Sequence, residues 1–249
     1  MPRLFLQASR ITGEHADVPA AGAKHLRALR MLPGSRITVF DEQGREHEAI
    51  VKRLGSRGAE LEIRASRQAD PGPRRPRIAL LAGILKGPRM DLVVEKATEL
   101  GVDHIVPMLT RFTVARVLGD DAGRLDRWRR LAVSAATQCG RSVLPTVAPP
   151  TAFDEAITTA VTTGSLGILF WEEQRSLTLR RARDVHPTPP ALVLAVGPEG
   201  GFAASEVETA RTAGFVVSGL GPRTLRAETA AVAALALCQT LWGDLSGES

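Results

Sequence analysis

The pattern of apolar residues in this chain changes at residues 67–77, and this change constrains the fold more than any other feature. The segment reads RQADPGPRRPR, with three prolines and almost no apolar side chains, which is typical of a linker. Short β-forming stretches precede it, and longer apolar segments follow it. The sequence therefore predicts two domains, 1–70 and 78–249, joined by a linker at 71–77.

The first domain reads mostly as β-strands. Residues 36–40, 46–53 and 59–64 are β-rich or alternate between apolar and charged side chains, and turn-forming residues separate them. A short helix is expected over residues 23–31. A small antiparallel β-barrel fits this pattern.

The second domain alternates between strands and helices. Its expected strands are 78–85, 104–108, 166–171, 191–196 and 215–220, and its expected helices are 90–100, 125–139, 153–161, 206–213 and 228–241. Ser205 and Glu208 have the spacing of a capping box for the helix over 206–213. Continuous apolar strands alternating with helices predict an α/β domain with a mainly parallel sheet.

Composition and charge narrow the function classes. The formal net charge is +5, and only four of the 32 basic residues are lysines, so arginine supplies most of the positive charge. Such a balance favours a polyanionic partner, and arginine matches phosphate geometry. A GC-rich coding sequence explains the arginine total equally well. The longest apolar run, residues 229–243, is shorter than the roughly 20 residues that span a bilayer. We therefore expect a soluble, cytoplasmic protein without a membrane segment or signal peptide.

Several familiar site types are absent from the sequence. It contains no phosphate-binding P-loop, no GxGxxG after a strand and no GxSxG elbow. Its five histidines are scattered, and Cys139 and Cys238 are far apart, so no metal site is expected. Both cysteines lie in helical stretches and are expected to be buried free thiols.

Two strand-to-helix connections in the second domain could carry chemistry. GPEGGF (197–202) follows an apolar strand, and its glycines would let a ligand approach the backbone. LGPRTLRAETA (220–230) places Arg226 and Glu228 beside an apolar helix. Each segment has a plain structural explanation: the first as a tight turn, and the second as a first-turn helix charge with solvated arginines.

Four segments together resemble the RsmE family of 16S ribosomal RNA uridine-N3 methyltransferases. They are LKGPRMDLVVEKATELGV (85–102), QCGR (138–141), GPEGGF (197–202) and LGPRTLRAETA (220–230). HLRALRMLPGSRITVFDEQG (25–44) matches less sharply. One departure is Thr137, where many relatives have Glu. The resemblance implies a fold class of α/β, with an N-terminal PUA-like barrel that binds RNA and a C-terminal SPOUT domain with a deep trefoil knot.

The resemblance also implies the activity and its residues. The enzyme would transfer a methyl group from S-adenosylmethionine to N3 of a uridine in the small ribosomal subunit, and would act as a homodimer. Arg226 would stabilise the anionic base, with Glu228 orienting Arg226 or accepting a proton. The residues expected to bind the cofactor are Leu194, Gly197, Pro198, Glu199, Gly200, Gly201, Leu220, Gly221, Leu225 and Arg226.

Positive side chains in both domains are candidates for contacts with RNA phosphates. They are Arg3, Arg10, Arg30, Lys86, Arg89, Arg111, Arg116 and Arg141. For each one alone, a solvated surface charge is an equally good explanation. Two other functions remain open: a related SPOUT enzyme that methylates a ribose 2′-hydroxyl, and a non-catalytic RNA-binding assembly factor.

Overall fold

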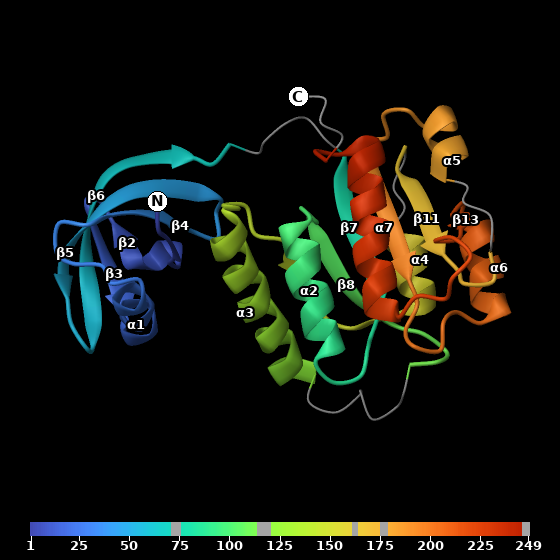
Figure 1. Ribbon diagram of the computed structural model, residues 1–249, viewed down its shortest axis with the longest axis horizontal. Helices are drawn as coiled ribbons and strands as arrows, with labels where there is room; N and C mark the ends of the chain where they lie inside the picture. Colours follow the sequence, from blue (N-terminus) through green and yellow to red (C-terminus); the bar gives the residue numbers. More distant parts are fainter. Residues whose placement is uncertain (71–75, 114–120, 161–163, 175–178, 246–249) are drawn as a thin grey trace. The chain divides into compact units, whose positions relative to one another are not determined.

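The computed structural model describes residues 1–70, 76–113, 121–160, 164–174 and 179–245 (Figure 1). Contacts divide the chain into two compact units. The first is Met1–Gly72 together with Val133–Leu144, and the second is Pro73–Ala132 together with Pro145–Ser249. A short stretch from the middle of the chain therefore packs with the N-terminal residues.

The first unit is built on a six-stranded sheet. Its strands are β1 (Arg3–Phe5), β2 (Ile11–Thr12), β3 (His15–Pro19), β4 (Arg36–Phe40), β5 (Arg45–Leu54) and β6 (Gly58–Gln68). They lie in the order β1-β4-β5-β6-β3-β2. Neighbouring strands among the described residues pair antiparallel, except β1 with β4, which pair parallel. The sheet is thus mixed rather than purely antiparallel, because the long connection from β1 to β4 allows β1 to join in parallel.

The core of the first unit follows from alternation along its strands. Ile37 and Val39 of β4 point to the same side as Leu61 and Ile63 of β6 and are buried with them. Helix α1 (Ala20–Ala28) covers this core with its apolar face, and the 3-10 turn η1 (Ala8–Arg10) precedes β2. This unit therefore has its own hydrophobic core.

The second unit contains a seven-stranded sheet. Its strands are β7 (Arg77–Gly83), β8 (His104–Leu109), β9 (Thr146–Val147), β10 (Thr151–Ala152), β11 (Leu166–Phe170), β12 (Ala191–Val196) and β13 (Val216–Ser218). The order is β10-β8-β7-β12-β11-β13, with β9 also on β8. Each pairing among these strands is parallel. The expected α/β domain with a parallel sheet is confirmed.

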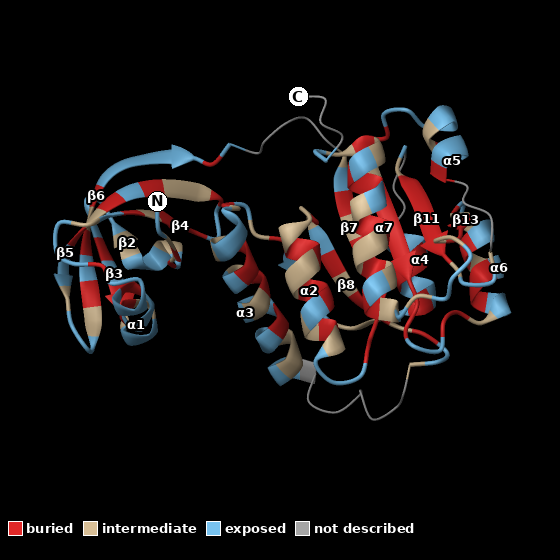
Figure 2. Cartoon of the chain, in the orientation of Figure 1, coloured by how far each residue is buried: buried red, intermediate tan, exposed pale blue. Residues whose placement is uncertain are grey.

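Helices cover both faces of this parallel sheet. They are α2 (Arg89–Glu99), α3 (Asp121–Cys139), α4 (Phe153–Ala160), α5 (Leu179–Val185), α6 (Ala204–Thr212) and α7 (Ala227–Trp242). Helices α2 and α7 lie on one face, and α4 and α6 lie on the other (Figure 1). Strand β12 shows the consequence: Leu192 and Leu194 join the core on the α7 side, whereas Val193 and Ala195 join the core on the α4 side. The central strands are accordingly buried along their length (Figure 2).

Helix α6 begins differently from the sequence prediction. Its first residue is Ala204, and the N-cap is Ala203, which has no side-chain oxygen. The Glu206 carboxylate instead accepts the N–H of Ala203 at 2.9 Å. The Ser205–Glu208 capping box is therefore wrong, because Ser205 already lies inside the first turn.

The two cysteines also differ from each other. Cys238 is buried inside α7, and burial raises the pKa of its thiol to about 12. Cys139 is an exposed free thiol at the C-terminal end of α3, which corrects the expectation that both are buried.

None of the helices among the described residues combines the length and the apolar character needed to span a bilayer.

Candidate active site

A cavity opens in the second unit beyond the carboxyl ends of β11 and β12. Its volume is about 400 Å³. It is lined by residues 170–172 at the end of β11 and just after it, 196–199 and 201 at the end of β12 and after it, 220–221 and 223–228 before and at the start of α7, and by Ala230 and Arg89. In an open parallel sheet this edge is the usual place for a ligand. The two connections singled out in the sequence form much of one cavity.

The connection after β12 folds back on itself. A Cβ atom at Gly197 would lie 2.9 Å from the carbonyl carbon of Gly201, so the two backbones are too close for any larger residue. Gly201 has a φ of +69°, and a Cβ there would collide with the carboxylate of Glu172. The glycines therefore serve close backbone packing, and Glu172 from the end of β11 lies directly over this loop.

Glu199 connects this loop to the end of β7 and the start of α2. Its Oε1 accepts the backbone N–H of Lys86 at 3.0 Å and an Nη1–H of Arg89 at 3.1 Å. Burial alone would raise the pKa of Glu199, but the hydrogen bonds from the backbone N–H groups of Lys86 and of Glu199 itself, together with Arg89, outweigh burial and lower the pKa below its usual range. The ionised carboxylate thus fixes one wall of the cavity.

Arg226 and Glu228 stand at the first turn of α7 in different surroundings. Arg226 is exposed, and its side chain makes no hydrogen bond or ion pair with the part of the chain that the structure describes. Glu228 is buried, its Oε1 lies 3.9 Å from Nε of Arg89, and its Oε2 has no hydrogen-bond partner among the residues that the structure describes. Among the described residues, Glu228 thus forms its ion pair with Arg89 and not with Arg226.

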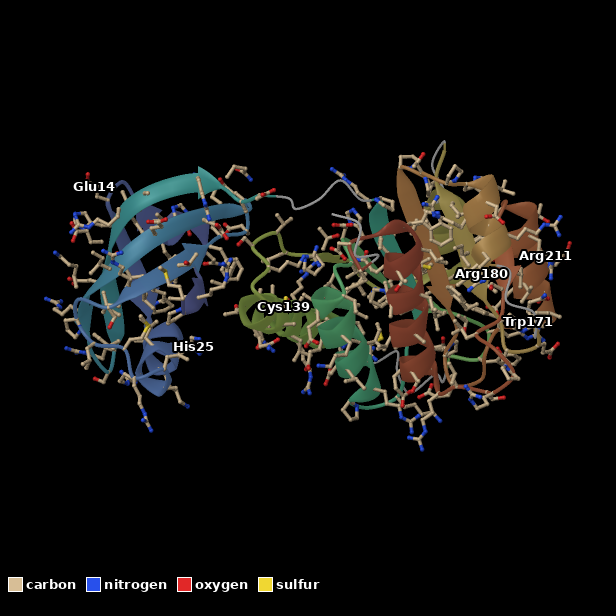
Figure 3. The ribbon with its side chains drawn as sticks, turned by 45° about the horizontal axis from the view of Figure 1, so that its top comes forward. Glu14, His25, Cys139, Trp171, Arg180 and Arg211 are labelled. Atoms are coloured by element: carbon tan, nitrogen blue, oxygen red, sulfur yellow. The ribbon has the colours of Figure 1, made fainter. Side chains whose placement is uncertain are left out.

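Trp171 contributes a second buried polar atom without a partner. It stands at the end of β11 (Figure 3), is half-buried and lines the cavity. Its indole Nε1 is buried and forms no hydrogen bond with any residue in the described ranges of the chain. Because buried polar atoms are nearly always paired, Trp171 Nε1 and Glu228 Oε2 together indicate a wall made for a polar ligand.

The structure brings most of the expected cofactor residues to this cavity. Gly197, Pro198, Glu199, Gly201, Leu220, Gly221, Leu225 and Arg226 line it. Leu194 does not, because it is buried in the middle of β12. Gly200 does not line it either, since it packs against Phe112. Sequence reasoning missed Phe170, Trp171 and Glu172, although a polar pair directly after an apolar strand was a usable signal.

The expected RNA-binding residues have varied environments. Arg10, Arg30, Lys86 and Arg111 are exposed. Arg3 is largely buried and donates to Glu46 at 3.0 Å and to Ser142. Arg89 is engaged with Glu199 and Glu228 in the cavity wall, and Arg141 is half-buried. Arg116 lies outside the described residues.

Comparison with known proteins identifies the family. The family model described as RNA methyltransferase domain matches residues 73–239. A ribosomal RNA small subunit methyltransferase E from Synechocystis is 32% identical over 86% of this chain and 69% of its own length. The corresponding protein of Mycobacterium bovis is 31% identical over 90% of this chain and 86% of its own. The chain belongs to the ribosomal RNA small subunit methyltransferase E family.

Solved structures of similar proteins agree with this family membership. A ribosomal RNA small subunit methyltransferase E from Neisseria gonorrhoeae, bound to S-adenosyl methionine, has a TM-score of 0.86 and 36% identity. The match covers 97% of this chain and 98% of that one. A putative methyltransferase from Legionella pneumophila, in complex with the same cofactor, has a TM-score of 0.83, 28% identity and 96% coverage of both chains. The family resemblance inferred from the four motifs is confirmed.

Proposed function

We propose that this chain transfers a methyl group from S-adenosylmethionine to N3 of one uridine in 16S ribosomal RNA. Membership of the methyltransferase E family supports a cofactor-dependent methyl transfer to ribosomal RNA. The observation that carries the proposal is the cavity beyond β11 and β12, which joins the two glycine-containing connections to Arg226 and Glu228. We choose uridine N3 as the target atom because Arg226 can stabilise the anionic base and Glu228 can accept the N3 proton.

The cavity has the chemical character that the cofactor requires. Apolar side chains of Phe170, Val196 and Leu225 offer a surface for the adenine ring. The unpartnered Trp171 Nε1 and Glu228 Oε2 offer a donor and an acceptor. The backbones of residues 197–201 and 220–225 would hold the cofactor, because the glycines let them approach it closely. The residues present therefore fit S-adenosylmethionine.

The reaction forms an N3–carbon bond, breaks a carbon–sulfur bond and releases the N3 proton. Bound S-adenosylmethionine supplies an electrophilic methyl group on a positively charged sulfur. N3 lies on the pairing edge of uracil, so the base must be unpaired before it enters the cavity. The exposed, unpaired guanidinium of Arg226 can then stabilise the anion that develops on the base as its proton leaves.

Three carboxylates line the cavity, those of Glu172, Glu199 and Glu228, and Glu228 lies two residues from Arg226 on the same connection. Glu199 is held by the Lys86 N–H and by Arg89, whereas Oε2 of Glu228 has no hydrogen-bond partner in the described part of the chain. We therefore assign Glu228 the role of proton acceptor, and Arg89 the role of its neighbouring cation. This assignment replaces the alternative in which Glu228 orients Arg226.

Positive side chains of both units would bind the phosphates of the RNA. The exposed Arg10, Arg30, Lys86 and Arg111 are the best placed for phosphate contacts, and we keep Arg116 and Arg141 in this group. Arg3 forms an ion pair with Glu46, and Arg89 forms ion pairs with Glu199 and Glu228. These two arginines would support the RNA-binding surface through those pairs. We further propose a PUA-like RNA-binding domain over 1–70, a linker at 71–77, a SPOUT domain with a trefoil knot over 78–249, a homodimer, and action in the cytoplasm.

The decisive experiment is a methyl-transfer assay with labelled S-adenosylmethionine. Small ribosomal subunits from cells lacking the gene would be the acceptor, and nucleoside analysis would identify the product. The proposal expects 3-methyluridine. A ribose-methylated nucleoside would replace the uridine-N3 assignment with a 2′-O-methyltransferase. A protein that binds the subunit but no cofactor would instead be an RNA-binding assembly factor.

A further inference from the structure

Phe112 is an aromatic side chain in an unusual place. The chain has seven Phe, three Trp and no Tyr, and all ten aromatic residues lie in the described part of the structure. Nine of them are buried or half-buried, and Phe112 alone is exposed, at 45%. A single exposed apolar side chain is common on protein surfaces. Its surroundings therefore decide whether it has a role.

The turn that carries Phe112 is held firmly. It follows β8, and the N–H of Thr113 donates to the carbonyl of Thr110 at 3.0 Å. The hydroxyl of Thr113 accepts the N–H of Thr110 at 2.9 Å. The N–H of Arg111 donates to Oε1 of Glu206 at 2.9 Å, while Oε2 of Glu206 accepts the N–H of Ala203. One buried carboxylate thus ties this turn to the start of α6.

The same turn adjoins the wall of the proposed cofactor cavity. A Cβ atom at Gly200 would lie 2.8 Å from Cβ and 3.3 Å from Cγ of Phe112, so the two residues are in close contact. Gly200 stands between Glu199 and Gly201, which both line the cavity, whereas Phe112 does not line it. Phe112 therefore packs against a loop residue whose two neighbours in sequence both line the cavity.

An exposed aromatic ring beside a site for a nucleic acid base has a specific use. Aromatic rings stack on unpaired bases, and this contact is tolerant of base identity because every base has a π-face. The exposed Arg111 precedes Phe112 and adds a positive charge that suits the adjoining phosphate. Because hydrogen bonds hold the backbone of this turn, little backbone freedom is lost when a base stacks on the ring.

We infer that Phe112 is a stacking platform for an unpaired base of the substrate RNA next to the target nucleotide. This inference rests on the proposed function, because it needs the target base to enter the adjoining cavity. A base on Phe112 would lie outside the cavity, so it belongs to a flanking nucleotide rather than to the reacting one. It contributes binding before and during the reaction alike, and so it affects KM more than kcat.

The test uses the full-length protein and the small ribosomal subunits described above. Phe112→Leu keeps an apolar side chain against Gly200 but removes the aromatic face, whereas Phe112→Trp keeps an aromatic face. Val185→Ala, on α5, is the matched control because Val185 is an exposed apolar residue outside the cavity. We expect Phe112→Leu to raise KM for the subunit about tenfold with kcat nearly unchanged. Phe112→Trp and Val185→Ala should behave like the wild type.

Cofactor affinity and oligomeric state complete the measurement. Phe112→Leu should bind S-adenosylmethionine as the wild type does and should keep the same mass by light scattering. An unchanged KM, a loss confined to kcat, or a change in oligomeric state would overturn the inference, the last by placing Phe112 against a second copy of the chain. A wild-type protein that methylates no subunit would overturn the proposed function itself, and this inference with it.

Discussion

Arg226 and Glu228 are two residues apart, and Arg226 is the exposed one of the pair. Its side chain is exposed in the cavity wall and unpaired among the described residues. We expect Arg226→Ala to slow methyl transfer by about 10²–10³-fold, the usual cost of losing one group that stabilises developing charge. Cofactor affinity, measured by calorimetry, should change little. Arg226→Lys keeps the charge and should retain part of the rate, and a normal rate in Arg226→Ala would remove this residue from the mechanism.

A substitution of Arg89 tests whether this side chain stabilises the cavity wall or contacts RNA phosphates. It bonds Glu199 and lies 3.9 Å from Glu228. Removing it leaves a buried carboxylate without its nearest cation, so we expect Arg89→Ala to reduce methyl transfer by about tenfold or more. Arg180→Ala is the control, because Arg180 is an exposed basic residue on α5 that does not line the cavity. If Arg89 contacts phosphate instead, the variant should weaken subunit binding while its cofactor affinity stays normal.

Glu46 makes the stability of the first unit sensitive to acid. Hydrogen bonds from Ser142, Arg67 and Arg3 outweigh burial and lower the pKa of Glu46 to about 2. Because this folded-state pKa is below the ordinary value of 4.5, the ionised carboxylate stabilises the fold above pH 4.5. That contribution is lost as the pH falls through about 2.

Glu46→Gln should therefore lower the free energy of unfolding at neutral pH by about 1–3 kcal/mol. The difference from the wild type should shrink in urea denaturation curves as the pH falls from about 5 to about 2. Glu48→Gln is the control, since Glu48 is an exposed neighbour on the same strand. A gap between Glu46→Gln and the wild type that stays constant into the acid range would show that Glu46 does not act through its charge.

At the scale of elements, the end of β7 and the connection after β12 are in backbone contact. A Cβ atom at Gly83 would collide with the backbone N of Pro198 and would lie 2.8 Å from the carbonyl carbon of Gly197. Neither atom can move without shifting the loop that lines the cavity. We expect Gly83→Ala to cost about 1–3 kcal/mol of stability and to weaken binding of S-adenosylmethionine. Gly55→Ala should be nearly neutral, because its nearest neighbour would be at 3.6 Å.

The sequence predicted the longer elements well, for a physical reason. Strands covered on both faces, such as β7 and β12, need continuous apolar runs, and helices such as α2 and α7 need one apolar face. This reasoning does not extend to short strands. Strands β9 and β10 have two residues each, and both are defined by their pairing with β8. The start of α6 was missed because Glu206 caps it from inside the helix.

The candidate site was only partly predictable for a related reason. Residues on one connection, such as 197–201 and 220–226, were found because their glycines and charges are neighbours in sequence. Trp171, Glu172 and the role of Arg89 depend on which strands lie side by side in the sheet. Strand order is set by packing across the whole sheet, so no local pattern could place β11 beside β12.

At the scale of the whole molecule, the net charge is +5, and most of the basic residues are arginines spread over both units. If exposed residues such as Arg10, Arg30 and Arg111 contact phosphates, each contact releases counterions when the RNA binds. Binding to the small subunit should then fall steeply between about 50 and about 200 mM salt, and Arg10→Ala should reduce the slope of log affinity against log salt by about one. Glu14→Gln, an exposed change in the same unit that leaves every arginine in place, should leave the slope unchanged. A wild-type affinity that barely depends on salt would mean that shape and base contacts, rather than phosphate contacts, hold the RNA.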